Sequence, residues 1–296
     1  MVSKAPQKYL HRWNSFTILA LFFICVLAPH AASASEGKEC QAIPATLSLG
    51  GTFRLRCSIP VSTATFQGRS VRLFQQSNGI WFGLMPVAVA DKPGKFSVEF
   101  LDSGGNSLRS FPVKIIDPHF PSQNVALSPE IEGLHSSPEE IKTLTSFRDA
   151  VSDTRYWVDP LFLPVPGCMK SPFGVKRLHN GKPTSEFHGG VDQRAADGAP
   201  IRAAAAGTIE IAQKFTVLGG TVGIDHGQGL ETMYLHMSKL EVEPGARVNR
   251  GDVIGYAGAT GRANGPHLHW VIYVNGVPVN PAQWVKLNSC ETSSKK

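Results

Sequence analysis

The segment NGPHLHW (residues 264–270) places two histidines one residue apart, directly after a glycine-proline turn. On an extended strand successive side chains alternate between faces, so His267 and His269 point the same way while Leu268 points into the opposite layer. The pattern therefore predicts a strand with two imidazoles on one face. Taken alone, the pair could equally be two solvated strand histidines, so the rest of the sequence has to decide between the two interpretations.

A second stretch, FHGGVD (residues 187–192), places a histidine and a carboxylate four residues apart. If it is a strand, His188 and Asp192 share a face, and the two intervening glycines let the backbone and bulky ligands approach closely. Together with a further histidine they form a set of three ligands, which leaves the fourth tetrahedral position for water, as catalytic zinc requires. Structural zinc sites usually close that position with cysteine, and the cysteines lie elsewhere.

The third element is YLHMS (residues 234–238), which puts His236 between the apolar residues Leu235 and Met237. Alone, such a residue is a core or surface histidine. Zinc hydrolysis, however, needs a group that takes a proton from the bound water and a group that stabilises the developing oxyanion. No H-E-x-x-H motif supplies a glutamate, so histidines are the candidates for these roles.

The remainder of the chain predicts a mostly β protein with two domains. From residue 168 onward, short β-rich runs alternate with glycine turns, and Asn275-Gly276 between VIYV and VPV predicts a hairpin with a two-residue turn. Runs such as TFRLRC and KFSVEFLD predict a small β-sandwich-like domain over residues 36–118. We expect a linker over residues 119–160, an antiparallel β-sheet or sandwich domain over residues 161–290 and a polar tail over residues 291–296.

One amphipathic helix is expected in the linker. Ser137 can cap it, Pro138 suits its first position, and Glu140 completes an S-x-x-E capping box. The expected apolar face contains Ile141, Leu144, Phe147 and Val151.

The first 34 residues have the features of a secretory signal peptide. Lys4, Lys8 and Arg12 precede an apolar run over residues 16–28, and Ala32-Ser33-Ala34 forms an A-x-A cleavage site. The run is shorter than the roughly 20 residues that span a bilayer, so we expect no membrane span after cleavage. The net charge of +6, to which this segment contributes three basic residues, lacks the dense basic stripe of a nucleic-acid-binding protein.

Four cysteines remain after cleavage, an even count that suggests two disulfides in an oxidising compartment. Three pairings are possible. We favour Cys40 with Cys57, which are near in sequence, and Cys168 with Cys290, which would tie together the ends of the second domain. Four free buried thiols are the alternative.

At residues 164–284 the chain resembles the LytM or lysostaphin-type zinc metallopeptidases of family M23, which have a duplicated hybrid motif β domain. The matching stretches occur in the family's order, and they are SPFGVKR (171–177), FHGGVD (187–192), YLHMS (234–238) and GDVIGYAGATGRANGPHLHW (251–270). The resemblance implies one Zn²⁺ per chain, held by His188, Asp192 and His269. It also implies that His236 and His267 are the catalytic pair. Within this pair we favour His267 as general base and His236 as donor to the oxyanion, although the sequence also allows the reverse.

Membership of this family would imply hydrolysis of peptide cross-links in bacterial peptidoglycan, with peptide stems as the partner. We expect an exported protein, in the periplasm or secreted. The alternative is a non-catalytic LytM-like cell-wall binding module that regulates an amidase. The presence of all three ligands and both catalytic histidines favours the enzyme, whereas the bond that is cut and the oligomeric state stay open.

Overall fold

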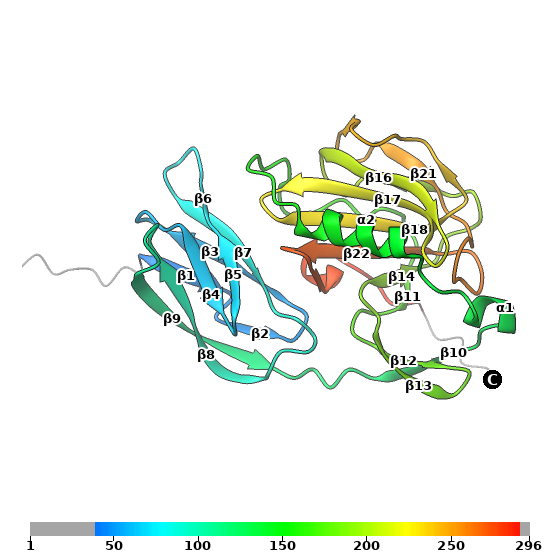
Figure 1. Ribbon diagram of the computed structural model, residues 1–296, viewed down its shortest axis with the longest axis horizontal. Coiled ribbons are helices and arrows are strands. Elements are labelled where there is room, and N and C mark those ends of the chain that lie inside the picture. Colours follow the sequence, from blue (N-terminus) through cyan, green and yellow to red (C-terminus); the bar gives the residue numbers. More distant parts are fainter. Residues whose placement is uncertain (1–38, 291–296) are drawn as a thin grey trace, which may run out of the picture. The chain divides into compact units, whose positions relative to one another are not determined.

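The computed structural model describes residues 39–290, which belong to one compact unit. The expected signal peptide and polar tail lie outside the described residues. Strands dominate the described part of the chain, where the only helices are two α-helices and one 3-10 helix, η1 (Pro281–Gln283) (Figure 1). The expected mostly β class is therefore confirmed. None of the helices in residues 39–290 is long and apolar enough to cross a membrane.

Two sheets form the N-terminal part, as the alternating runs predict. The first has the order β1 (Cys40–Ile43), β3 (Thr52–Cys57), β7 (Trp81–Pro86), β6 (Phe74–Gln75). The second has the order β2 (Thr46–Ser48), β9 (Ser107–Ile116), β8 (Gly94–Leu101), β4 (Thr63–Phe66), β5 (Arg69–Arg72). Their inner faces bury one apolar cluster that includes Phe53, Leu55 and Phe100. Inward-facing residues of both sheets thus give this part its own core.

The C-terminal part is built on a sheet of eight strands. Seven follow the order β11 (Met169–Ser171), β14 (Val191–Gln193), β22 (Leu268–Val274), β18 (Leu230–Met237), β17 (Gly219–Gly227), β16 (Gly207–Phe215), β20 (Arg247–Val248), and β23 (Val277–Val279) pairs with β22. Asn275 and Gly276 connect β22 to β23 with φ angles of 45° and 75°. These values fit a type I′ turn, so the predicted hairpin is confirmed.

Two further sheets of three strands complete the fold. One has the order β15 (Pro200–Arg202), β21 (Val253–Tyr256), β19 (Lys239–Leu240), and the other has the order β10 (Ser122–Val125), β12 (Lys176–His179), β13 (Lys182–Phe187). The pairing of β10 with β12 is parallel. A segment that follows the sheets of the N-terminal part therefore takes part in a sheet of the C-terminal part.

Both predicted disulfides are confirmed. Cys40 and Cys57 face each other across β1 and β3, and Cys168 is bonded to Cys290, 122 residues further along the chain. The second bond joins the start of the C-terminal sheet to the last described residue.

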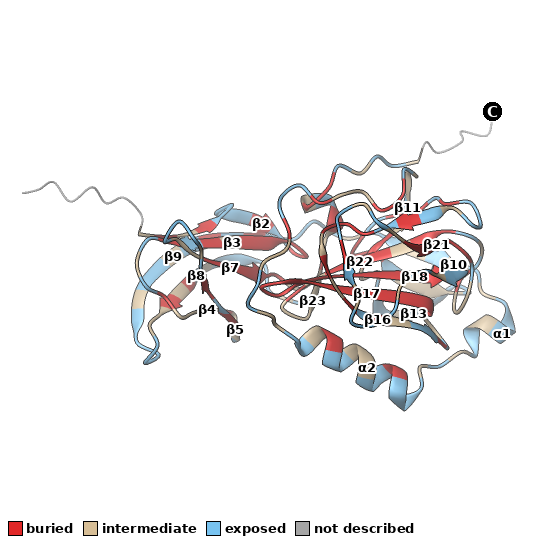
Figure 2. Ribbon diagram, turned by 90° about the horizontal axis from the view of Figure 1, so that it is seen from above, coloured by how far each residue is buried: buried red, intermediate tan, exposed pale blue. Residues whose placement is uncertain are grey.

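The central strands β17 and β18 are buried along their whole length, and β22 is largely buried (Figure 2). On one face Tyr234 and Trp270 belong to the main apolar core. On the other face Met233 and Leu235 pack with Phe147 from helix α2 (Pro138–Asp149). The sheet is thus covered on both faces, and consecutive residues of its central strands are buried rather than alternately buried and exposed.

Helix α2 begins as the capping pattern predicts, since the Ser137 side chain accepts a hydrogen bond from the Glu140 backbone N–H. The predicted apolar face is partly wrong. Phe147 is buried, but Ile141 is 55% exposed and Glu140 is only 1% exposed. The Glu140 carboxylate lies inside because it accepts hydrogen bonds from three successive backbone N–H groups, those of Thr216, Val217 and Leu218.

A second, four-residue helix, α1 (Pro129–Glu132), was not expected from the sequence. It begins after Ser128, whose side chain accepts from the Ile131 backbone N–H. The linker thus contains two helices rather than one, each with serine at the cap and proline at the first position.

Glu231 on β18 is a buried acid without a hydrogen-bond partner. Neither oxygen of its carboxylate has one among residues 39–290, and its side chain lies opposite Asp225 on β17 and Tyr273 on β22. Burial, and then repulsion by Asp225, raise its pKa to about 9. The folded protein therefore holds a proton on Glu231 at neutral pH.

We expect the substitution Glu231→Gln to stabilise the protein at alkaline pH. Between the ordinary glutamate pKa and about 9, unfolding releases the proton of Glu231, so the free energy of unfolding falls as pH rises. A neutral amide removes this loss, which grows by up to about 1.4 kcal/mol for each pH unit over that interval. Thermal unfolding of wild type, Glu231→Gln and the exposed control Glu243→Gln at pH 5 and pH 8 measures it. A gain that is equal at both pH values would contradict the explanation.

Candidate metal centre

Three side chains from separate segments meet at one edge of the central sheet. Asp192 on β14 lies directly opposite His269 on β22. His188 lies before β14, in the turn that follows β13, so the expectation that His188 and Asp192 share one strand is wrong. Position 190 requires glycine, because a Cβ there would lie 2.2 Å from the backbone oxygen of Trp270. The glycine lets β22 approach closely, and the bend brings His188 to the same point.

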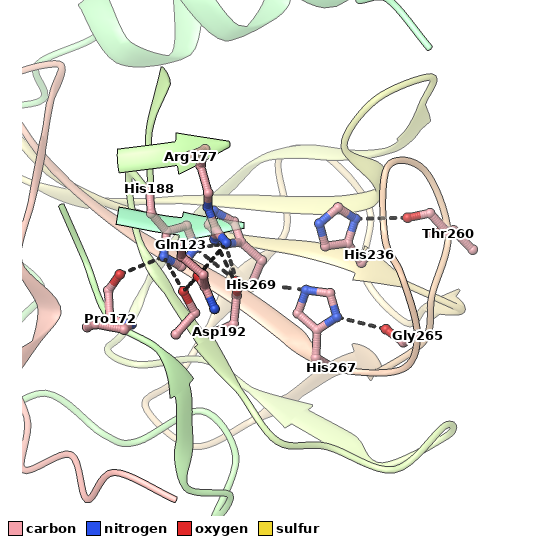
Figure 3. A network of polar contacts seen from close by, with 11 residues as sticks. Gln123, Pro172, Arg177, His188, Asp192, His236, Thr260, Gly265, His267 and His269 are labelled. Atoms are coloured by element: carbon pink, nitrogen blue, oxygen red, sulfur yellow. Dashed lines mark hydrogen bonds and ion pairs between the residues drawn. The ribbon is translucent and has the colours of Figure 1, made fainter. Parts of the chain in front are cut away.

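The donor atoms of these three residues converge (Figure 3). Asp192 Oδ1 lies 2.7 Å from His269 Nδ1 and 2.9 Å from His188 Nε2, and the two imidazole nitrogens are 2.9 Å apart. This is the one group of at least three potential metal-ligating residues in the described part of the chain. The structure therefore brings together the three residues that the sequence suggested as ligands.

The protonation states of this cluster suit a divalent cation. His188 Nδ1–H donates to the Pro172 carbonyl at 2.7 Å, which leaves the lone pair of Nε2 toward the cluster. Burial lowers the pKa of His269 to about 4, so its imidazole is neutral. Burial opposes ionisation of Asp192, but its close contacts with His188 and His269 outweigh it and hold its pKa well below the usual value. Imidazole nitrogens and a carboxylate are ligands that zinc accepts.

His236 and His267 lie beside the cluster, with ring centroids 5.0 Å apart. His236 Nδ1 is 2.8 Å from the Thr260 carbonyl oxygen, and His267 Nδ1 is 2.8 Å from that of Gly265. A carbonyl only accepts, so in both residues Nδ1 carries the proton. In Figure 3 both rings lie between these carbonyls and the ligand cluster, and His267 Nε2 is 3.8 Å from Asp192 Oδ1. In the neutral form of either ring, Nε2 is therefore the nitrogen without a proton.

The backbone of His236 has the left-handed φ of 62°. Such a conformation is uncommon for a non-glycine residue and is held here by neighbours, because His236 N–H donates to Leu218 O at 3.0 Å. Burial, followed by the nearby His269 and His267, lowers the pKa of His236 to about 3. His236 is thus a neutral imidazole fixed at both its backbone and its ring.

These five residues lie in a groove of about 340 Å³. One part of its wall is formed by Gln123, Val125 and Leu127, from the segment before α1, and another part by Val217 and Leu218, which follow β16. The turn that Glu140 holds is therefore a part of the groove. His179 also lines it.

Sequence reasoning gave no role to the side chains that support the cluster. Arg177 donates to Asp192 Oδ2 at 3.1 Å, and the Ser171 hydroxyl oxygen lies 3.3 Å from His188 Nδ1. Both residues belong to the SPFGVKR stretch, which was the available signal. His226, by contrast, lies on β17 rather than in a turn, and its ring contacts Ala206 O and Thr232 Oγ1, so it supports the core and not the cluster.

A mostly β fold with a His/Asp/His cluster in an open groove, flanked by two further imidazoles, is typical of a metallopeptidase. Comparison with known proteins gives the family. Residues 186–281 match Peptidase family M23. A crystal structure of an M23-type peptidase from Pseudomonas aeruginosa is 30% identical, with a TM-score of 0.62, and the match covers 80% of this chain and 94% of that one. The chain belongs to peptidase family M23.

Curated relatives match a shorter region. DD-carboxypeptidase/endopeptidase Mpg of Neisseria meningitidis is 43% identical over 113 residues, which are 38% of this chain and 26% of the relative. Peptidoglycan DD-endopeptidase ShyA of Vibrio cholerae is 38% identical over 112 residues, again 38% of this chain and 26% of the relative. The chain thus spans about a quarter of the length of these relatives.

Proposed function

We propose that this chain is an exported zinc metalloendopeptidase that hydrolyses peptide cross-links of bacterial peptidoglycan, most simply in a periplasm. The observation that carries the proposal is the convergence of His188, Asp192 and His269 in an open groove beside His236 and His267. The names of the curated relatives, which include peptidoglycan DD-endopeptidases, supply the substrate class. In this proposal residues 161–290 are the peptidase domain, behind a small β domain at residues 36–118.

His188, Asp192 and His269 would hold the metal, because their donor atoms already face one another and carry suitable protonation states. When bound, zinc supplies a Lewis acid that stabilises charge on the scissile carbonyl oxygen and lowers the pKa of a water molecule toward about 7. The groove gives an extended peptide access to this point from solvent.

His267 is the residue that we assign as general base. Its Nδ1–H is fixed on the Gly265 carbonyl, so the free Nε2 can take a proton from the attacking water and later deliver it to the leaving amine. Its position next to Asp192 places this transfer beside the ligand cluster.

His236 is less suited to the oxyanion donation that the sequence analysis favoured. With Nδ1–H on the Thr260 carbonyl, Nε2 has no proton to donate unless the ring becomes cationic, and a pKa of about 3 opposes that. We infer that His236 Nε2 accepts a hydrogen bond from the water and orients it for attack.

Digestion of purified cell walls tests the proposed function. Gram-negative and Gram-positive sacculi would be incubated with the zinc-loaded mature chain, or with its His269→Ala variant, and the products separated by mass spectrometry. We expect dimeric muropeptides to disappear only with the intact ligand set, and the fragments to identify the bond. No product from either wall would contradict the enzyme and favour a binding module that regulates an amidase.

A further inference from the structure

Strand β10 lies against the metal centre although it precedes the residues that match the M23 family. It pairs in parallel with β12, so that Gln123 lies opposite Arg177. Hydrogen bonds fix both ends of this pairing, from Lys176 N–H to Pro121 O at 2.9 Å and from Asn180 N–H to Val125 O at 3.1 Å. The strand is therefore held beside the sequence motif that supports the ligands.

The Gln123 side chain contacts both of the side chains that support the ligands (Figure 3). Its Oε1 accepts hydrogen bonds from the Ser171 hydroxyl at 2.7 Å and from Arg177 Nη1 at 2.8 Å. Because a guanidinium only donates, the amide oxygen and not the nitrogen must face Arg177. One oxygen atom of the connecting segment thus holds two side chains of the C-terminal part.

Each of these two side chains also contacts a different one of the proposed metal ligands. Ser171 gives its proton to Gln123, so its oxygen faces His188 Nδ1–H at 3.3 Å as a second, longer acceptor beside the Pro172 carbonyl at 2.7 Å. Arg177 uses its other terminal nitrogen to donate to Asp192 Oδ2 at 3.1 Å. That bond leaves Asp192 Oδ1 for the cluster with His188 and His269. Gln123 is therefore linked, through one intermediate each, to two of the three ligands.

The network is mostly shielded from solvent, so water would poorly replace a lost acceptor. Ser171 is 2% exposed, and the side chains of Arg177 and Asp192 are 14% and 15% exposed. Without the Gln123 oxygen, a buried hydroxyl and a guanidinium N–H lose their partner, and both groups are free to turn away from the ligands. Residues that orient metal ligands in this way typically contribute 10–100-fold, roughly, to metal affinity or activity.

We propose that Gln123 is a positioning residue of the metal centre, and that the segment carrying it is part of the peptidase unit rather than an inert connection. The proposal rests on the proposed function in one respect, namely that a metal binds to His188, Asp192 and His269. If the segment merely covered the groove, loss of Gln123 would expose the site without weakening metal binding. That outcome would distinguish a cover from a positioning role.

Metal affinity of the full mature chain tests this role without any assay of hydrolysis. Competition with a chromogenic chelator gives the Zn²⁺ dissociation constant, and the visible absorption of bound Co²⁺ reports the ligand geometry. Gln123→Met keeps the length but removes the acceptor, and we expect about 10–100-fold weaker binding and an altered Co²⁺ spectrum. Gln123→Glu retains an acceptor oxygen, and we expect it to bind at least as tightly as wild type.

A matched control separates the acceptor from the attachment of the strand. Asn180 has a φ of 50° and its side chain bonds the connecting segment at Leu127 and Glu132, remote from the ligands. Asn180→Gly tolerates that φ and loses those bonds, and we expect unchanged zinc affinity. Equal affinity of Gln123→Met and wild type would overturn the proposal, as would equal weakening by Gln123→Met and Gln123→Glu.

The ligand variant His269→Ala distinguishes this failure from that of the proposed function. If wild type and His269→Ala bind zinc equally, the metal centre itself is wrongly assigned. If only wild type binds zinc and Gln123→Met binds as wild type does, the positioning role alone fails. Thermal unfolding of each metal-free variant identifies those that lose zinc because they do not fold.

Discussion

His188→Ala is expected to give a folded protein with no measurable hydrolysis and a zinc affinity reduced by far more than the roughly 100-fold upper range of supporting residues. The variant removes one of three donor atoms that lie within 2.9 Å of one another and leaves Asp192 and His269 as the remaining ligands. Metal analysis after dialysis, together with digestion of sacculi, measures both losses.

His135→Ala serves as the control for a histidine lost elsewhere, because His135 is exposed and lies outside the groove lining. We expect it to retain zinc and activity. A His188→Ala protein that keeps stoichiometric zinc would show that His188 is not a ligand, whatever happens to its activity.

His267→Ala, in contrast, should retain its full zinc content and lose turnover. We expect a turnover number lower by about 10²–10⁴-fold, the range of a lost general base. The reason is geometric. His267 Nε2 lies 3.8 Å from Asp192 Oδ1, beside the cluster rather than within the group of converging donors. Zinc stoichiometry and kcat, measured on the same preparation, test the retained zinc and the lost turnover together.

Added imidazole provides a further check on His267, since a small base that enters the emptied space should restore part of the turnover of His267→Ala but none of that of His188→Ala. Full turnover of His267→Ala without imidazole would refute the assignment as base, and loss of its zinc would make it a ligand. The double variant His236→Ala/His267→Ala should be little worse than His267→Ala, because both rings act on one water molecule.

The five residues expected at the site could be found from sequence because their chemistry and spacing are local. Two histidines one residue apart meet a His-Gly-Gly-x-Asp turn, and the structure brings His188, Asp192 and His269 together. The supporting residues could not be found in this way. Gln123 and Arg177 are 54 residues apart in sequence, and only the parallel pairing of β10 with β12 makes them neighbours. Nor does any local pattern indicate the left-handed φ of His236.

The fold, like the site, could be predicted from sequence only where it depends on adjacent residues. Turn chemistry predicted the hairpin at Asn275-Gly276 and the start of α2 after Ser137, because both depend on a few adjacent residues. The face that α2 buries was only partly predicted. Helical periodicity predicts that the apolar Ile141 is buried. Three backbone N–H groups of a distant turn need an acceptor, however, and Glu140 is buried because its carboxylate accepts from them. Partners contributed from 76 to 78 residues away lie beyond any periodicity argument.

The same Glu140 anchor decides where this protein can be divided for domain grafting. A chimera joined at residue 161 would transfer the turn at residues 216–218 without the carboxylate that its backbone N–H groups bind. A junction near residue 119 would transfer helix and turn together. A portable unit that keeps this contact is therefore longer than the stretch by which sequence comparison recognises the family.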